Sequence, residues 1–223
     1  NDFINKSFDN LIIKLMWKVV GDVNISEKIV LDLFDGFETD LNECVKIKSK
    51  KDLLVYSYRV AGTVGLMMSK ILKVVNKESL KGAIDLGIAM QLTNIARDVI
   101  EDKNRNREYI ECTFSSIKEV INNAEILYEK SFLALSSIPI RSRFSIIVAR
   151  RIYKKIGEYI LKQENIEKYT NAGKIYVPMP AKILETILSV VDFLKLLFVK
   201  RINYYDNESH SILNQEINLN ERI

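Results

Sequence analysis

The sequence predicts an all-α protein that folds as a single helical bundle. Its 223 residues include only 8 Gly and 3 Pro and are rich in Ile, Leu, Lys and Glu, a composition that favours helices. Apolar residues recur at helical spacing in about seven stretches of the chain. Neither an internal repeat nor a long linker divides these stretches, so one bundle around one apolar core is expected.

Residues that break helices separate the seven predicted helices. Gly21 and Asp22 end the first helix, a lysine run ends the second, and Asn76 ends the third. Ser79 suits the start of the fourth, and Pro139 separates the fifth from the sixth. The predicted helices cover residues 3–20, 26–46, 51–75, 79–102, 115–137, 141–163 and 181–202.

The polar end of the chain holds its single histidine. Residues 203–223 are expected to form a polar tail, frayed or loosely docked on a helical domain of residues 1–202. Because His210 lies in this tail, a Ser-His-Asp triad and a multi-histidine metal site are not expected. Cys44 and Cys112 are far apart in the sequence and indicate neither a disulfide framework nor a zinc site. Any metal is therefore expected to be a hard cation with oxygen ligands.

Charge and hydropathy limit the classes of partner. The formal net charge is +4, and the densest basic run, Lys46, Lys48, Lys50 and Lys51, contains no aromatic residue. This pattern indicates a solvated helix end rather than a nucleic-acid patch. Neither an apolar run of membrane-spanning length nor a secretory signal is seen, and the start at Asn1 is compatible with processing or with a fragment. We expect a cytoplasmic protein, soluble or peripheral on the inner membrane.

A polar stripe runs along the predicted helix 79–102. Gln91, Asn94, Asp98 and Asp102 follow the spacing i, i+3, i+7, i+11 and so point the same way from an otherwise apolar segment. Two acids at this range repel each other unless a cation intervenes. Mg²⁺ takes one or two carboxylates together with water and phosphate oxygens, and an amide oxygen can join them. The alternative interpretation is a solvated edge on which the acids pair with Lys103 or Arg105.

Two glycines interrupt the apolar helix predicted over residues 51–75. Gly62 and Gly65 each cost about 1 kcal/mol relative to alanine inside a helix, so two of them suggest a purpose. They allow either close packing of helices or room for a long hydrocarbon lined by small and flexible side chains. Tyr56 and Tyr58 in the same segment could place hydroxyls or ring faces near a cation.

These two segments resemble the squalene/phytoene synthase family, and within it the bacterial phytoene synthases. The resemblance is carried by residues 56–65, YSYRVAGTVG, and 91–102, QLTNIARDVIED. Weaker likeness covers residues 31–41 (LDLFDGFETDL), 138–160 and 174–184, so the whole resemblance spans roughly residues 29–184. It implies the all-α bundle of class I isoprenoid synthases. It also implies a Mg²⁺-dependent prenyltransferase, with Mn²⁺ as an alternative cation, that joins two prenyl diphosphates head to head through a cyclopropyl diphosphate intermediate.

The resemblance also assigns roles to single residues. Asp98 and Asp102 match the family's second aspartate-rich motif and would bind Mg²⁺, with Asn94 as a further metal or diphosphate ligand. Gln91 would lie near the reacting carbons. The other matches place Tyr56 and Tyr153 near the diphosphate and the carbocations, Arg97 and Lys174 on the diphosphate, and Val60, Gly62, Val64 and Gly65 in the wall of the hydrocarbon tunnel.

The sequence departs from the family pattern in three places. One is the run after Asp102, where the family usually has a Gly-Arg-x-Tyr-Leu-Pro-like sequence and a longer loop, and this chain has NREYIE at residues 106–111. The first aspartate-rich motif is not found upstream of residue 29, so the chain is expected to lack the N-terminal part of the family fold. Lys174 stands where the family often has arginine, which changes the phosphate contact.

The function implied is formation of phytoene, in carotenoid biosynthesis, from two molecules of geranylgeranyl diphosphate. The alternatives are a squalene or dehydrosqualene synthase, because tunnel length sets the product, and a non-catalytic relative that acts as an assembly or scaffold protein. Residues 181–202 form either a core helix or the apolar face of a peripheral membrane protein. The oligomeric state is left open.

Overall fold

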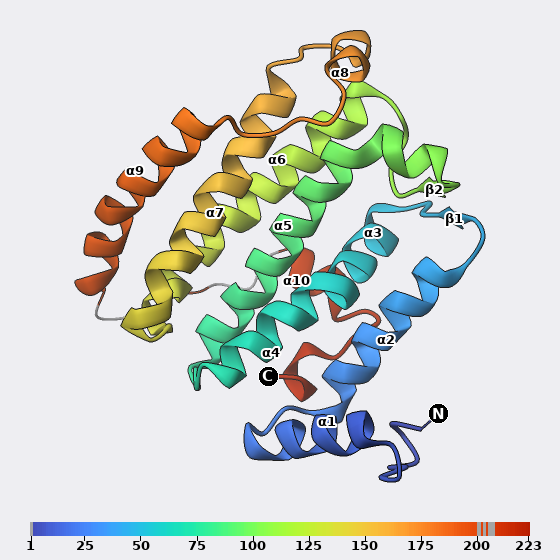
Figure 1. The fold of residues 1–223 in the computed structure, drawn as a ribbon, viewed down its shortest axis with the longest axis vertical. Coiled ribbons are helices and arrows are strands. Elements are labelled where there is room, and N and C mark those ends of the chain that lie inside the picture. The colour runs from blue at the N-terminus through green and yellow to red at the C-terminus, as the bar shows by residue number, and fades with distance from the viewer. Residues whose placement is uncertain (1, 200–201, 203, 205–207) are drawn as a thin grey trace.

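Helices make up almost the whole of the computed structural model, which describes residues 2–199, 202, 204 and 208–223. Most of the long helices lie side by side, and α1 lies across one end of the molecule (Figure 1). In chain order the elements are α1 Leu11–Asp22, α2 Glu27–Leu41, β1 Val45–Lys46, α3 Lys50–Ser57, the π-helix η1 Tyr58–Gly62, α4 Thr63–Ile71, α5 Lys77–Asn104, β2 Arg107–Glu108, α6 Phe114–Ser131, the 3-10 helix η2 Leu133–Ser137, α7 Ile140–Leu161, α8 Ile166–Ala172, α9 Met179–Leu197, α10 Glu208–Leu213 and the 3-10 helix η3 Leu219–Glu221.

Helix α5 is the centre of the bundle. It contacts α4, η1, α6, α7 and η2. Ile84, Ile88, Leu92 and Ile95 recur along it at helical spacing, and each is at most 2% exposed. The Asn76 side chain caps its first turn by accepting a hydrogen bond from the backbone N–H of Ser79 at 2.8 Å. The polar stripe is therefore held on the best-packed element of the molecule.

The predicted helix over residues 51–75 is interrupted. It divides into α3, η1 and α4, and the five residues of η1 have π-helical hydrogen bonds. π-helical turns often occur at functional sites. A Cβ atom added at Gly65 would lie 2.3 Å from the carbonyl oxygen of Ala83, and one added at Gly87 would lie 2.3 Å from that of Ala61. Both positions require glycine because the backbones of this segment and α5 touch there.

A short parallel pair of strands, β1 and β2, was not predicted. Val45 pairs with Arg107, and Lys46 pairs with Glu108. The backbone N–H of Val45 donates to the carbonyl of Asn106 at 3.0 Å. This pair joins the end of α2 to the segment that follows α5, and the predicted helix 26–46 accordingly ends at Leu41.

The end of the chain is packed, which corrects the expectation of a frayed or loosely docked tail. His210, Leu213 and Leu219 are each at most 1% exposed. Arg222 donates to both carboxylate oxygens of Asp32 on α2, at 3.0 and 3.1 Å. The division into a domain of residues 1–202 and a tail of residues 203–223 stays a prediction.

Other predicted boundaries were wrong at the ends of the helices. The first helix begins at Leu11 rather than residue 3, because Asn10 caps it. The last long helix, α9, ends at Leu197. Residues 200 and 201 of the predicted helix 181–202 lie outside the described residues. Helix α8 was not predicted, and the seven residues of that helix are too few to establish a period.

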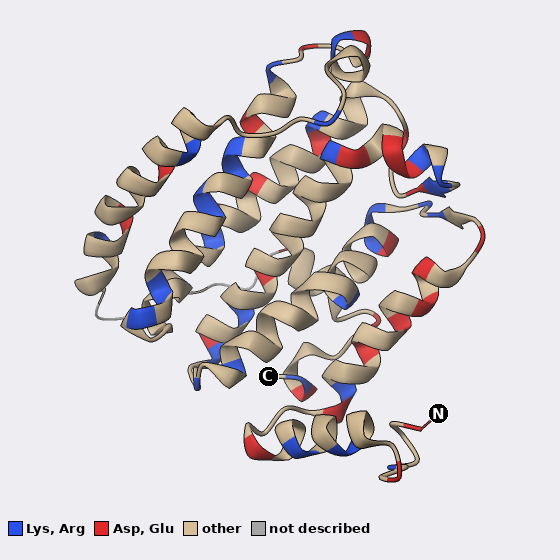
Figure 2. Cartoon of the chain, viewed as in Figure 1, with Lys and Arg blue, Asp and Glu red and all other residues tan. Residues whose placement is uncertain are grey.

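Helix α9 buries polar residues and exposes apolar ones. Glu185, Ser189 and Asp192 are each at most 8% exposed. Figure 2 shows basic residues along α7, beside the acidic residues of α9. Arg151 on α7 donates to Glu185 at 2.9 Å and to Asp192 at 2.7 Å. The opposite face of α9 is apolar, so this helix is inverted relative to an ordinary surface helix.

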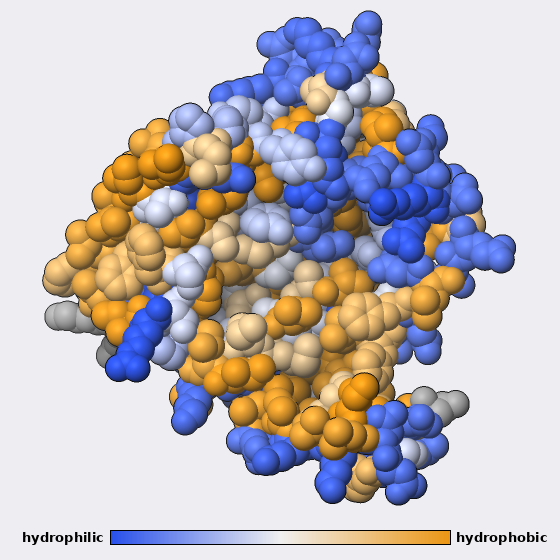
Figure 3. Space-filling model, in the orientation of Figure 1, coloured by the Kyte–Doolittle hydropathy of each residue, from blue (hydrophilic) through white to orange (hydrophobic). Residues whose placement is uncertain are grey.

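Exposed apolar side chains gather over two regions of the surface. Figure 3 shows them over α9 and again over α1 and the neighbouring α4. On α9 the exposed members are Ile183, Leu184, Ile187, Leu188, Val190, Val191, Leu194 and Leu197, and Phe198 follows the helix. Among the described residues, no helix combines the length and the hydropathy that crossing a membrane requires.

Candidate active site

The four residues of the polar stripe lie along the second half of α5. Gln91, Asn94, Asp98 and Asp102 are all half-buried, which places them at the edge of the core. The Oδ1 atom of Asn94 is buried and has no hydrogen-bond partner within the described part of the chain. An acceptor of this kind is costly unless a ligand or an ion meets it.

Asp98 is held by two cations. Arg97 donates from Nε and Nη2 to the two carboxylate oxygens, at 2.9 and 2.6 Å. Lys174, from the segment between α8 and α9, approaches Asp98 at 3.2 Å and Glu101 at 2.8 Å. Burial opposes ionisation of Asp98, but these cations hold its pKa below the usual range.

These ion pairs differ from the pairing considered in the sequence analysis. Arg105 pairs with Glu101 at 2.8 Å, and Lys103 is exposed. Two predicted diphosphate-binding residues, Arg97 and Lys174, are thus brought together on one carboxylate. Glu101, which the spacing placed off the stripe, joins the site through Lys174.

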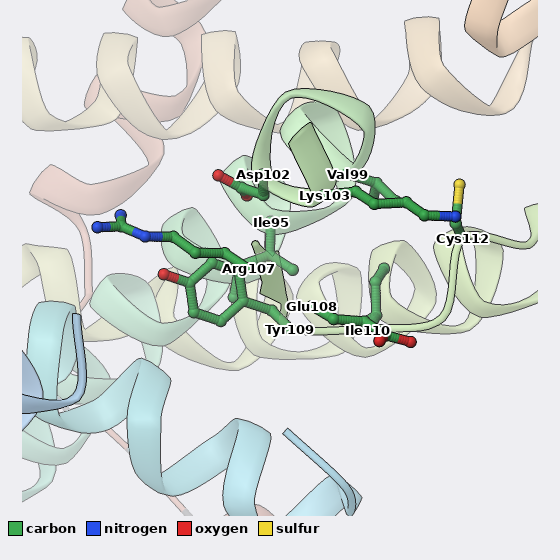
Figure 4. Close-up of a pocket in the computed structure, with 9 residues that line it drawn as sticks. All are labelled: Ile95, Val99, Asp102, Lys103, Arg107, Glu108, Tyr109, Ile110 and Cys112. Carbon is green, nitrogen blue, oxygen red and sulfur yellow. The ribbon is translucent and has the colours of Figure 1, made fainter. Parts of the chain in front are cut away.

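Asp102 lines a separate small cavity. The cavity encloses about 100 Å³ between the end of α5 and the segment after it. Figure 4 shows Asp102 on the same side of this cavity as the side chains of Arg107 and Tyr109, with Lys103 pointing the other way. Burial and the charges of Asp98 and Glu101 raise the pKa of Asp102 to about 6.

A carboxylate and two phenols meet beside this cavity. Tyr109 donates to Oδ1 of Asp40 at 2.7 Å, and Tyr56 donates to the same atom at 2.9 Å. The two rings are stacked with their centroids 4.8 Å apart. The sequence analysis assigned Tyr56 to the site but missed Asp40 and Tyr109. The signal for Asp40 was its place in the weakly matching segment LDLFDGFETDL.

An apolar cavity of about 390 Å³ lies between η1, α4, α5, η2 and α7. Val60, Val64 and Gly65 line it, as the resemblance implied for the tunnel wall. Gly62 does not line it, because it packs against Tyr58, Ile84 and Ile88. Gly65 fits both roles considered for the glycines, because it borders the cavity and also allows the backbone of α4 to approach α5 closely.

Tyr153 and Gln91 complete the predicted set. Tyr153 is half-buried on α7 and lies within electrostatic reach of Arg97 and Tyr128. Gln91 follows Met90, which lines the apolar cavity. Along α5 the order is therefore the apolar cavity, then Gln91 and Asn94, then the two acids.

The oxygen donors suit a hard divalent cation. In the described ranges, no group of three or more His, Cys, Asp or Glu side chains could hold a metal ion. Mg²⁺ needs fewer, because water and phosphate complete its shell. A cation would supply a partner for the unbonded Oδ1 atom of Asn94. It would also offset the repulsion of Asp102 by the negative charges of Asp98 and Glu101. Asn94, Asp98 and Asp102 therefore fit such an ion chemically.

Comparison with solved structures defines the class of protein. A dehydrosqualene synthase solved in complex with a ligand matches 77% of this chain and 66% of its own, with a TM-score of 0.62 and 27% sequence identity. A squalene synthase from Alicyclobacillus acidocaldarius matches 68% of this chain and 65% of its own, with a TM-score of 0.60 and 16% identity. The fold is the helical bundle of the isoprenoid synthases.

Sequence comparison indicates the family that the chain resembles. The squalene/phytoene synthase family model matches residues 9–110. A 15-cis-phytoene synthase from Paracoccus sp. is 37% identical over 59% of this chain and 49% of its own length. Another from Pantoea ananas is 32% identical over 60% of this chain and 50% of its own. Over these residues the chain is similar to the squalene/phytoene synthase family, and it spans about half the length of these curated relatives.

Proposed function

We propose that the protein is a Mg²⁺-dependent prenyltransferase of the phytoene synthase type. In the proposed reaction two geranylgeranyl diphosphates condense head to head, through a cyclopropyl diphosphate intermediate, to phytoene. The observation that carries this proposal is the order of features along α5, where an apolar cavity of about 390 Å³ is followed by the Asn94–Asp98–Asp102 edge. A prenyl diphosphate has the same order, with a hydrocarbon chain joined to an anionic head.

The acidic edge would bind the head of the substrate. Asn94, Asp98 and Asp102 would hold Mg²⁺ or Mn²⁺, which when bound neutralises charge on the leaving diphosphate. Arg97 and Lys174 supply two cations at the same edge, within 3.2 Å of Asp98. Both can donate hydrogen bonds to phosphate oxygens, Arg97 in a bidentate manner.

The apolar cavity would bind the hydrocarbon and exclude water. When the allylic C–O bond breaks, the electron pair leaves with the diphosphate and a carbocation remains. The side chains of Val60, Val64 and Met90 offer this cation no nucleophile. The hydroxyls of Tyr56 and Tyr109 are tied to Asp40 at the edge of the site. Gln91 and Tyr153 are proposed to lie near the reacting carbons.

The product test uses two substrates in parallel. The purified chain is incubated with Mg²⁺ and either geranylgeranyl or farnesyl diphosphate, and the hydrocarbons are extracted and separated by chromatography. A C40 product supports the phytoene proposal. A C30 product favours squalene or dehydrosqualene synthesis, the activities named for the two similar solved structures. Asp98→Asn should abolish either product, whereas Glu38→Gln, an exposed acid on α2, should not.

Binding separates a catalytic from a scaffold role. Calorimetry with Mg²⁺ and inorganic pyrophosphate tests the acidic edge without requiring turnover. If the wild type binds neither and yields no product, the enzyme proposal is wrong and a non-catalytic assembly protein becomes the better interpretation.

We further propose that the protein is cytoplasmic and associates peripherally with the inner membrane. The support is the exposed apolar face of α9, where Ile183, Ile187 and Val191 are each about half exposed. A substrate with a long hydrocarbon chain partitions into lipid, so a synthase at the bilayer surface meets it at high local concentration.

A further inference from the structure

Asp40 lies at the end of α2 and contacts three groups from other elements. Its carboxylate accepts from the hydroxyl of Tyr109 at 2.7 Å and from that of Tyr56 at 2.9 and 3.1 Å. Its backbone carbonyl accepts from Nη2 of Arg107 at 2.9 Å. One half-buried residue thus contacts the end of α3 and the segment that follows α5.

The hydrogen bonds determine what the phenols can offer to a ligand. Each phenol has one proton, and the side chain of Asp40 accepts a hydrogen bond from both of them. The oxygens of Tyr56 and Tyr109, which are 3.1 Å apart, then retain lone pairs. Because Tyr109 lines the cavity of Asp102 and Arg107, its oxygen is presented there as an acceptor. Such an oxygen favours a cation or a donor such as metal-bound water.

The same contacts place Arg107. Its guanidinium donates to the Asp40 carbonyl beside the parallel pair of β1 and β2, in which Val45 pairs with Arg107. Figure 4 shows Arg107 and Tyr109 side by side, on the side of the cavity that holds Asp102. A free arginine here would have many rotamers, and the Asp40 carbonyl selects one.

We propose that Asp40 is a positioning residue for the diphosphate edge. Its carboxylate orients the hydroxyl of Tyr109, which lines the cavity of Asp102, together with that of Tyr56, and its backbone carbonyl holds the guanidinium of Arg107 at the same cavity. The ligand class is a diphosphate with its divalent cation, so this inference rests on the proposed function. Asp40 acts through the tyrosines and keeps its own carboxylate, which a carbocation would alkylate, behind them.

The first measurement is tyrosine ionisation, which requires no ligand. Burial, together with the hydrogen bond to Asp40 and its charge, raises the pKa of Tyr109 to about 12. Absorbance near 295 nm is followed with rising pH in the wild type, Asp40→Asn and Glu38→Gln. Asp40→Asn should move one tyrosine to lower pH by about 1 unit, and Tyr109→Phe should remove that transition. The exposed Glu38 removes a charge from the same helix and should move nothing.

The second measurement is a double-mutant cycle on the affinity for inorganic pyrophosphate with Mg²⁺. Asp40→Asn and Tyr109→Phe should each weaken binding about tenfold, and the double variant should be no weaker than either, because the two residues act as one unit. Additive losses, or an unchanged tyrosine titration, would overturn the positioning role. Absence of pyrophosphate binding in the wild type would instead count against the proposed function, and the titration would still decide the role of Asp40.

Discussion

Asp98 and Asp102 lie one helical turn apart on α5 in opposite electrostatic surroundings. Asp98 is ion-paired with Arg97 and Lys174, which hold its pKa low despite burial. Asp102 is half-buried and faces the charges of Asp98 and Glu101, so its pKa is raised to about 6. An aspartate in the unfolded chain has a pKa of about 4. Between pH ~4 and ~6, Asp102 is therefore largely protonated in the folded protein and largely ionised in the unfolded chain.

The two acids should respond oppositely to removal of charge. The raised pKa of Asp102 costs stability, and this cost grows as pH rises from ~4 through ~6. Asp102→Asn should thus raise Tm by about 1 to 2 °C at pH 7.5, a modest gain because solvent screens a half-exposed group, and should leave Tm unchanged at pH 4. Asp98→Asn should lower Tm at pH 7.5 by about 2 to 4 °C. Calorimetry at both pH values checks this, and equal signs for the two variants would refute it.

Lys174 should have opposite effects on the affinity for Mg²⁺ and on the affinity for pyrophosphate. It occupies Asp98, a proposed Mg²⁺ ligand, at 3.2 Å, and it is also a proposed diphosphate contact. Lys174→Gln should therefore tighten binding of Mg²⁺ alone and weaken binding of pyrophosphate with Mg²⁺, each about threefold to tenfold. Titration calorimetry gives both affinities, with Lys182→Gln as the control. A loss of both affinities would indicate that Lys174 is needed only for the fold.

At the scale of elements, glycines allow the backbones of the η1–α4 segment and of α5 to pack in direct contact. Cβ atoms at Gly65 and Gly87 would each lie 2.3 Å from a backbone carbonyl oxygen, and backbone cannot move aside as a flexible side chain can. Gly87→Ala should cost about 2 to 3 kcal/mol of unfolding free energy, measured by urea denaturation. Gly21→Ala on α1, where nothing lies within 4 Å of the new Cβ, should leave the unfolding free energy unchanged or raise it by about 0.5 kcal/mol. Equal effects at the two positions would contradict the close approach.

Buried ion pairs help to dock α9 on α7. Glu185 and Asp192 are buried against α7, where Arg151 pairs with both. Arg151→Met would leave two acids poorly compensated and should cost about 3 kcal/mol. The exposed Arg141 lies on the same helix, so Arg141→Met should change the unfolding free energy by less than about 0.5 kcal/mol. Urea denaturation at pH 7.5 measures both, and a loss below 1 kcal/mol for Arg151→Met would show that α9 docks by other contacts.

Helices could be predicted because their periodicity is local, whereas the site depends on distant pairs. The line Gln91, Asn94, Asp98 and Asp102 follows from spacing alone. The contact between Asp40 and Tyr109 joins residues 69 apart, and no pattern within either segment indicates it. Two-residue strands such as β1 carry no period either. The resemblance supplied the roles of Arg97 and Lys174, but only the tertiary fold shows both on Asp98.

At the scale of the whole molecule, the packed end of the chain explains a second failure of prediction. Residues 203–223 are mostly polar, and this polarity led to the prediction of a frayed or loosely docked tail. His210 is nevertheless buried beside Asp85 of α5, with Nε2 and Oδ1 2.8 Å apart, and Leu213 and Leu219 are also buried. A few apolar anchors at irregular spacing are enough to dock a segment, and such spacing has no helical signature.

The apolar face of α9 is left uncovered by the described elements of the chain. The apolar residues of α9 form a continuous strip that begins near the exposed Tyr176 and ends at Phe198, which is 81% exposed. Aromatic residues at both ends of an apolar strip are typical of an interfacial helix lying on a bilayer. The exposed Lys195 adds a cation that anionic lipid attracts.

Vesicle flotation tests this face. The wild type should float with vesicles that contain phosphatidylglycerol, and Ile187→Glu/Val191→Glu should reduce the bound fraction at least tenfold, because charges in the strip would have to enter lipid. Ile126→Glu is the matched control, since Ile126 is an exposed apolar residue on α6, away from α9. Size-exclusion chromatography of the same proteins distinguishes the other occupant. If the double variant still floats but turns a dimer into a monomer, the strip of α9 joins two copies of the chain and the membrane proposal is wrong.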